Sequence, residues 1–159
     1  MFLSDSISDM DEKGKKVLNS LEAQCSKREY CRKDILAKAL KALEVDAAAA
    51  DEVVASLVKD RFVDDARYAG AFARQKAHLD GWGPVKIRYS LRAKGVDGSV
   101  IDEALSSLDP ERAGAKLEKL LDAKAKSLEG DPQKNLKLIK YALSRGYDYD
   151  QVRDYISLH

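Results

Sequence analysis

The sequence predicts an all-α protein of three tandem three-helix repeats, and three observations support this fold class. Ala, Leu, Lys and Glu are plentiful, whereas the chain has only 9 Gly and 3 Pro among its 159 residues, a composition typical of helical proteins. Apolar residues recur at helical spacing in successive segments. Corresponding apolar residues in these segments lie 51 positions apart. Repeats of this size bury their apolar faces against neighbouring copies, so we expect an elongated, curved helical array.

The repeat is clearest between the second and third copies. At a separation of 51 residues, Ile87, Leu91, Gly95, Val96, Ile101 and Leu105 match Leu138, Ala142, Gly146, Tyr147, Val152 and Ile156. The same separation backwards reaches Leu36, Leu40, Glu44 and Val45. The first copy then needs about three extra residues, the run Ala47–Ala50, before Val53 and Leu57 fall into place. The predicted organisation is a flexible tail at 1–10 and repeats at 11–60, 61–108 and 109–159.

The first repeat is predicted to hold three helices, each with one apolar face. They cover residues 11–25, residues 30–43 and a segment that begins after Val45-Asp46. The residues expected to be buried are Val17, Leu18 and Leu21, then Ile35, Leu36, Leu40 and Leu43, and finally Val53, Val54, Leu57 and Val58.

The second repeat carries the strongest start and stop signals. Asp64 and Asp65 stand where an N-cap and a first-turn acid are expected. The buried face of the helix that follows is predicted to comprise Tyr68, Ala69, Phe72 and Leu79. The run Gly81–Pro84 ends this helix, and proline suits the first position of the next one. Gly95 then closes the middle helix as a C′ residue, and a short helix follows with Val100, Ile101, Ala104 and Leu105.

The third repeat begins at Asp109-Pro110, again with proline in a first turn. Its long helix has an apolar stripe of Leu117, Leu120, Leu121 and Leu128, and Gly130-Asp131-Pro132 interrupts it. A middle helix is predicted over residues 136–144, with Leu138, Ile139, Ala142 and Leu143 on its apolar face, and Arg145-Gly146 ends it. A last short helix carries Val152, Tyr155 and Ile156.

Composition excludes several classes of function. The chain has 28 Lys and Arg against 27 Asp and Glu, a net charge of +1, so any affinity for nucleic acid must come from local charge separation. No stretch approaches the roughly 20 apolar residues of a membrane span, and the first residues do not resemble a signal peptide. We therefore expect a cytoplasmic protein that does not bind membranes.

The residues contain no pattern typical of catalysis or of a cofactor or metal site. Gly81-Trp82-Gly83 is not followed by the Gly-Lys-Ser/Thr of a phosphate-binding loop. Asp64-Asp65 could pair at a metal, but a helix N-cap explains them better. Cys25 and Cys31 lack zinc spacing and are expected in the core, without a disulfide. His78 has no evident partner and is expected at the surface. The chain is predicted not to be an enzyme.

Basic residues gather on the predicted middle helices. From Arg61 to Gly95 there are eight Lys and Arg against three Asp, a local charge of +5. The short third helices are instead acidic in all three copies. Single lysines are explained by a solvated helix face with i,i+4 pairs, but recurring segregation of charge favours a surface that binds a phosphate backbone or an acidic protein groove. The candidate binding residues are Arg67, Arg74, Lys76, Lys86, Arg88, Arg92, Lys94, Lys137, Lys140 and Arg145.

Trp82, the only tryptophan, lies in a predicted turn. Its expected role is to pin that turn against a pair of helices. The alternative is an exposed contact residue.

Several motifs together resemble the RecX family, bacterial regulators of the recombinase RecA. They are Phe62–Ala69, Gly81–Pro84, Lys86-Ile87, Lys94-Gly95-Val96 and the run Leu143–Tyr147. The chain departs from the family at Cys31, where serine is usual, at Glu44, where many members have glycine, and in its short amino-terminal extension.

The resemblance implies an all-helical modulator that binds in the deep groove of the RecA–DNA filament. It implies inhibition of ATP hydrolysis, strand exchange and co-protease activity, and thus a role in recombination, DNA repair and the SOS response. We expect a monomer that needs no cofactor, with the basic middle helices touching filament acids or DNA. The alternative is a helical module that acts by occupying single- or double-stranded DNA, and a third interpretation is a helical scaffold for another partner.

Overall fold

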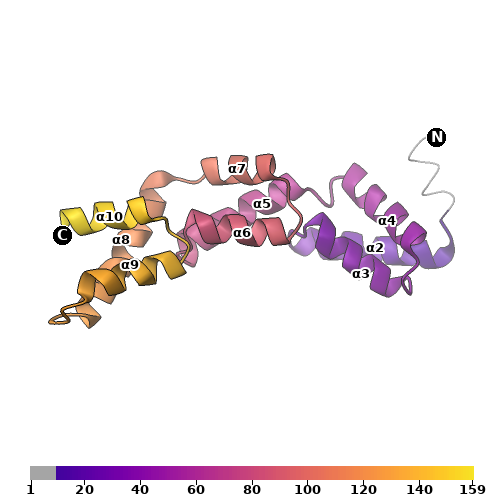
Figure 1. Ribbon diagram of the computed structural model, residues 1–159. Coiled ribbons are helices and arrows are strands. Elements are labelled where there is room, and N and C mark those ends of the chain that lie inside the picture. Colours follow the sequence, from indigo (N-terminus) through magenta and orange to yellow (C-terminus); the bar gives the residue numbers. More distant parts are fainter. Residues whose placement is uncertain (1–9) are drawn as a thin grey trace. The chain divides into compact units, whose positions relative to one another are not determined.

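The computed structural model describes residues 10–159, and every regular element in that part of the chain is helical (Figure 1). The all-α prediction is thus confirmed. The elements are α2 (Glu12–Lys27), α3 (Arg32–Ala42), α4 (Ala47–Lys59), α5 (Asp65–Arg74), η1 (Gln75–Leu79), α6 (Pro84–Ala93), α7 (Gly98–Ser106), α8 (Pro110–Ser127), α9 (Lys134–Ser144) and α10 (Tyr149–Leu158). The predicted tail lies outside the described residues except for Met10, which is buried.

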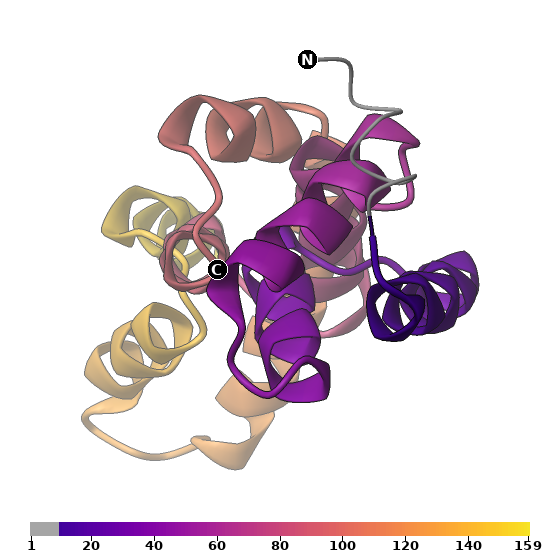
Figure 2. The ribbon, with the colours of Figure 1, turned by 90° about the vertical axis from the view of Figure 1, so that its right-hand side faces the viewer.

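The chain divides into two compact units, each with its own set of packed helices. Unit 1 comprises residues up to Ala69 together with Lys94–Val96, and unit 2 comprises Gly70–Ala93 and Asp97–His159. Within unit 1, α2, α3 and α4 lie side by side around an apolar core (Figure 2). In unit 2, the helices α8, α9 and α10 enclose a second core. The predicted repeat boundaries, which fall between α4 and α5 and between α7 and α8, stay a prediction.

Aspartate side chains start many of these helices by accepting a bond from an orphan backbone N–H. Asp11 accepts from Gly14 N at 2.7 Å, and Asp46 accepts from Ala49 N at 3.1 Å. Asp64 accepts from Arg67 N at 3.1 Å, which confirms its predicted role as an N-cap. At α10, Asp148 and Gln151 form a reciprocal capping box. The turn chemistry visible in the sequence therefore places the helix starts.

The short third helices keep the separation of 51 residues through all three copies. Their N-caps are Asp46, Asp97 and Asp148. The first deeply buried positions after these caps are Ala50, Ile101 and Val152, each with 0% of its surface exposed. The predicted three-residue insertion in the first copy is therefore wrong, because an alanine occupies the site that a larger residue fills in the other copies.

The turn before α4 departs from its counterparts. Gly95 and Gly146 take positive φ values of 76° and 92°, whereas the first copy uses Glu44 at 55° followed by Val45 at 60°. The second left-handed residue turns its side chain outward, so Val45 is 79% exposed while the matched Val96 is 4% exposed. Helix α3 buries the predicted Ile35 completely, and also Ala39, whereas the predicted Leu36 and Leu40 are half-buried.

Two further residues predicted to be buried are exposed. Leu79 is 66% exposed because α5 continues into the π-helical turn η1, whose wider turn shifts the buried face onto Ala77. Val58, near the end of α4, is 36% exposed because it lies at the edge of a face that Val54 and Leu57 already fill. Neither position could be placed by ideal helical spacing.

Unit 2 holds a close junction between the end of α9 and the start of α6. Gly83 N donates to Arg145 O at 2.8 Å, and Val85 N donates to Gly146 O at 2.9 Å. Carbonyl groups of the turn after α9 thus satisfy N–H groups that α6 leaves unpaired. A Cβ at Gly83 would lie 2.3 Å from the Gly146 backbone, and one at Gly146 would lie 2.2 Å from Lys86 Cβ. Both glycines are required because the two backbones touch.

Candidate partner-binding surface

Two of the ten predicted binding residues belong to unit 1, and both hold the fold together. Arg67 bonds the Glu29 carboxylate and donates to the carbonyl of Arg61 at 3.0 Å. Lys94 Nζ lies 2.9 Å from Asp34 Oδ2. The hydrogen bonds to Glu29 and Asp34 raise the pKa of Arg67 and of Lys94, respectively. These charges are therefore already partnered within the chain.

Arg145 secures the turn that precedes α6. Its guanidinium donates to Gly81 O at 3.3 Å and also to Asp80 O. Since Gly81 has a φ of 68°, this turn is a left-handed conformation that the arginine braces. Arg145 thus contributes to the junction between α9 and α6 in addition to its charge.

The Trp82 ring lies beside two lysines in the same turn. Lys76 Nζ is 4.6 Å and Lys86 Nζ is 4.3 Å from the ring centroid, within cation–π range. The Phe72 and Trp82 rings meet edge to face with centroids 6.2 Å apart, and Trp82 N donates to Lys76 O at 2.8 Å. These contacts are those expected of a residue that pins the turn.

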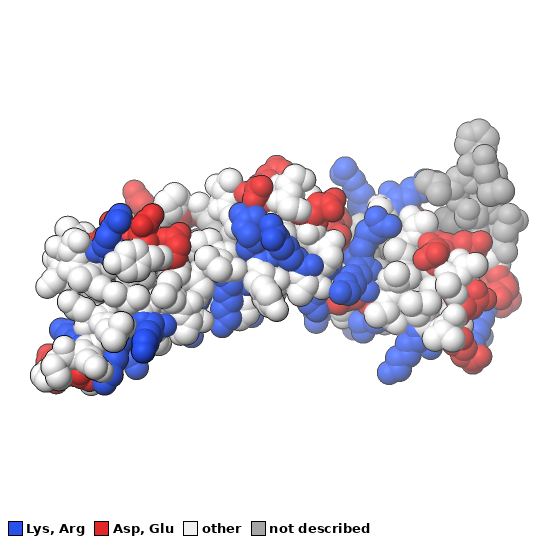
Figure 3. All heavy atoms as spheres, in the orientation of Figure 1, with Lys and Arg blue, Asp and Glu red and all other residues white. Residues whose placement is uncertain are grey.

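The outward face of α6 combines cations with exposed apolar groups. Val85 is 57% exposed and Tyr89 is 76% exposed, one turn apart. Arg92 follows on the same face and forms no ion pair with any described residue, while Arg88 Nη1 lies 2.6 Å from Asp102 Oδ1 of α7. Figure 3 shows basic side chains over α6 with acidic groups of α7 beside them. The basic and acidic helices of one repeat thus neutralise each other only in part.

The corresponding positions of α9 are also exposed. Leu136 and Leu143 are each 47% exposed, so the prediction that Leu143 belongs to the buried face is wrong, and Lys140 between them is exposed. At the 51-residue separation Leu136 matches Val85, Lys140 matches Tyr89 and Leu143 matches Arg92, so each of the two middle helices of unit 2 presents a mixed face. We call this set the outer face: Val85, Tyr89, Arg92, Leu136, Lys140 and Leu143. An exposed aromatic and aliphatic set with cations is typical of a recognition surface.

Two further predicted cations, Lys137 and Arg74, are not part of the outer face. Lys137 pairs with Asp131 at 2.5 Å in the turn before α9, and this bond is the first cause of the lowered pKa of Asp131. Arg74 is exposed and its guanidinium folds back over Gly70. Of the ten residues, Arg92 and Lys140 fall on the outer face itself.

Sequence reasoning missed the apolar part of this face. Tyr89 stands two positions from both Ile87 and Leu91, which form the buried stripe of α6. A separation of two residues places a side chain on the opposite side of a helix. That spacing was the signal by which an exposed tyrosine could have been found.

The other titratable residues considered from the sequence do not form a site. Cys25 and Cys31 are free and buried as predicted, and burial raises the pKa of both thiols. His78 is half-buried rather than at the surface, and its Nε2 has no hydrogen-bond partner among the described residues. Residues 10–159 hold no cluster of His, Cys, Asp and Glu suited to a metal ion. Within the same residues, no helix combines the length and apolar composition needed to cross a bilayer.

Comparisons with known proteins agree with one another. A family model for the second three-helix domain of RecX matches residues 64–105. The regulatory protein RecX of Chlorobium phaeobacteroides (strain BS1) is 30% identical over 148 residues, covering 91% of this chain and 93% of that relative. The regulatory protein RecX of Clostridium botulinum (strain Eklund 17B) is 41% identical over 99 residues, or 60% of this chain. The chain spans about half the length of several such relatives, for example 46% of this one.

Solved structures share the fold. The crystal structure of RecX from Lactobacillus salivarius has a TM-score of 0.78 with this chain at 22% sequence identity, and the match covers 94% of this chain and 97% of that one. A second crystal structure of a regulatory protein RecX also has a TM-score of 0.78, at 24% identity. The tandem three-helix arrangement is thus common to these proteins.

Proposed function

Since this chain belongs to the RecX family of regulatory proteins, we propose that it regulates the bacterial recombinase RecA by binding the RecA–DNA filament. In this proposal it occupies the filament groove and inhibits ATP hydrolysis, strand exchange and co-protease activity, and so modulates recombination and repair. It acts as a cytoplasmic monomer without catalysis of its own. Family membership supports the choice of partner, and the outer face supplies the contact surface.

The observation that carries the surface assignment is the exposure of Tyr89 beside Arg92. Packing of α6 uses Ile87 and Leu91, which are fully buried, so the fold gains nothing from an outward tyrosine at 76% exposure. Tyrosine and arginine are the residues that most often dominate protein interfaces. An amphipathic, positively charged surface of this kind suits a filament that offers both acidic protein groups and a phosphate backbone.

We expect purified protein to suppress the ATPase of RecA on single-stranded DNA. The double variant Tyr89→Ala/Arg92→Glu should need at least about tenfold more protein for the same inhibition, since loss of each hot-spot side chain costs on the order of 1–2 kcal/mol. The measurement is ATP hydrolysis against protein concentration. Full inhibition by the variant at wild-type concentrations would remove these residues from the surface.

The matched control is Tyr149→Ala/Arg112→Glu, which changes an exposed tyrosine and an exposed arginine elsewhere in unit 2. It should inhibit like the wild type, and circular dichroism should show equal helix content in all three proteins. Absence of both inhibition and filament binding by the wild-type protein would refute the proposed function itself.

Tyr89 between Arg88 and Arg92 also favours a second candidate, direct binding of single-stranded DNA. In that case the ring would stack on a base while the guanidinium groups contact phosphates. Gel shifts without RecA, over a range of salt concentrations, separate the two. Tight, steeply salt-dependent binding to DNA alone would favour the second candidate.

A further inference from the structure

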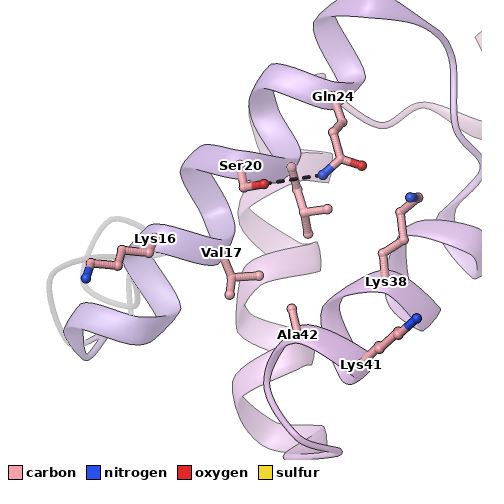
Figure 4. A pocket seen from close by; sticks show the side chains of 8 residues that line it. Lys16, Val17, Ser20, Gln24, Lys38, Lys41 and Ala42 are labelled. Carbon is pink, nitrogen blue, oxygen red and sulfur yellow. Dashed lines mark hydrogen bonds between the residues drawn. The ribbon is translucent and has the colours of Figure 1, made fainter.

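Unit 1 contains an open groove between α2 and α3. The groove has a volume of about 520 Å³, within the range of sites that bind ligands. Side chains of both helices line it (Figure 4). They are Lys16, Val17, Ser20, Leu21 and Gln24 from α2 and Lys38, Lys41 and Ala42 from α3.

The floor of the groove is apolar and its rim is positively charged. Val17, Leu21 and Ala42 supply the floor, and Leu21 belongs to the core of the unit. Lys16 stands on the α2 side, and Lys38 and Lys41 stand one turn apart on the α3 side (Figure 4). The uncharged polar groups of α2 satisfy each other, since Gln24 Nε2 donates to Ser20 Oγ at 3.3 Å.

The lysine charges of this groove are not neutralised by the chain. No carboxylate lines the groove, and none of its three lysines forms an ion pair with a residue in 10–159. Lys38 lies 5.3 Å from the Tyr30 ring, a cation–π contact that leaves its charge in place. By contrast, Lys13 on the same helix pairs with Glu44, and Lys15 pairs with Glu12.

We propose that this groove binds an acidic amphipathic helix of a protein partner. Apolar residues on one face of such a helix would cover the floor, and acidic residues flanking that face would meet the three lysines. Helices recognised in grooves present such anchors at i, i+3 or i+4 and i+7. A nucleic acid would satisfy the lysines but would leave the exposed parts of Val17 and Ala42 without an apolar partner. The groove is a second contact surface, independent of the outer face and of the identity of the partner proposed above.

The test uses the full chain and a synthetic helical probe. The probe is a fluorescent peptide of about 15 residues, with leucine at i, i+4 and i+7 and glutamate on the flanking positions. Fluorescence anisotropy should show binding that weakens as salt is raised, because rim charges are screened. A peptide with every glutamate replaced by glutamine should bind at least about tenfold more weakly. Equal affinity for the two peptides, or no binding of the acidic peptide, would overturn the proposal.

Variants locate the site. Lys38→Glu/Lys41→Glu should weaken peptide binding by about tenfold or more, whereas the control Lys119→Glu/Lys126→Glu on α8 should leave it unchanged. Ala42→Phe tests the floor without changing charge, and because Ala42 is exposed the variant should fold and lose binding. Equal loss in the control pair would mean non-specific attraction and would overturn the assignment. The assignment would also be overturned if a single-stranded oligonucleotide displaced the peptide and bound more tightly to the wild type than to the Lys38→Glu/Lys41→Glu variant.

Discussion

Single residues show where local rules suffice and where packing overrides them. Asp64 was predicted as an N-cap and the helix start at Asp109-Pro110 was predicted from its proline, because capping depends on a few neighbouring atoms. The burial of Ile35 was predicted correctly, but the half-burial of Leu36 beside it was not, because ideal spacing fixes a helix face only to within about one residue. Tertiary contacts then decide which residues of that face are covered. The conformation of Val45 was the hardest to predict, because a positive φ is unfavourable for valine and no sequence periodicity indicates it.

Tyr155 offers a test at this scale. The pKa of Tyr155 is raised to about 12, first by burial and second by the hydrogen bond that its hydroxyl donates to Asp122. Because the folded pKa lies above the ordinary value of 10.0, the contribution of Tyr155 to stability is complete below pH 10 and is lost as pH rises towards 12. Spectroscopic titration of tyrosinate should therefore show a late component near pH 12.

Tyr155→Phe should remove the part of the late component that titrates near pH 12, whereas Tyr68 and Tyr147, whose pKa values are also raised by burial, remain. The comparison variant Tyr149→Phe removes an exposed tyrosine and should leave the late component intact. If the late component has the same amplitude in Tyr155→Phe as in the wild type, the hydroxyl does not bond Asp122 in the folded protein.

Elements are joined through backbone contacts that the sequence reveals only indirectly. The pattern predicted that Gly83 ends a turn and that Gly146 ends a helix, and both are so. Nothing in the periodicity placed these two glycines against each other, because their contact joins residues far apart along the chain. Only the cations of the outer face were predicted, because the sequence shows directly that α6 and α9 are rich in basic residues. The exposure of Tyr89 and Leu136 depends on which side of each helix other helices cover, and the sequence does not show this.

Gly146→Ala should destabilise the protein by about 2 kcal/mol or more. The left-handed conformation costs alanine roughly 1–2 kcal/mol, and the Cβ of alanine would lie 2.2 Å from Lys86 Cβ. Urea denaturation gives the change in the free energy of unfolding. Gly114→Ala is the matched control, since Gly114 lies in α8 with nothing within 4 Å of the added Cβ, and it should stabilise by roughly 0.5–1 kcal/mol. A neutral Gly146→Ala would mean that the junction is looser than described.

At the scale of the whole molecule, the fold class was predictable because three copies repeat one apolar pattern. The repeat of 51 residues holds even in the first copy, where an insertion was predicted, since Asp46, Asp97 and Asp148 occupy the N-cap positions of equivalent helices. The division into two units was not predictable, because its boundary at Ala69 falls inside α5 rather than in a loop. A net charge of +1 likewise conceals two separate surfaces that carry cations, one in each unit.

Trp82 gives the molecule a built-in optical probe. It is the only tryptophan, so all indole emission comes from the turn that Arg145 and the α9 carbonyl groups hold beside α6. Trp82 is half-buried, so opening of that junction would expose more of the ring to water and shift its emission to longer wavelength, even while the helices stay intact. In Gly146→Ala at low urea we expect this red shift with little loss of far-ultraviolet dichroism. Simultaneous loss of both signals would instead show that the junction and the helices of unit 2 unfold as one.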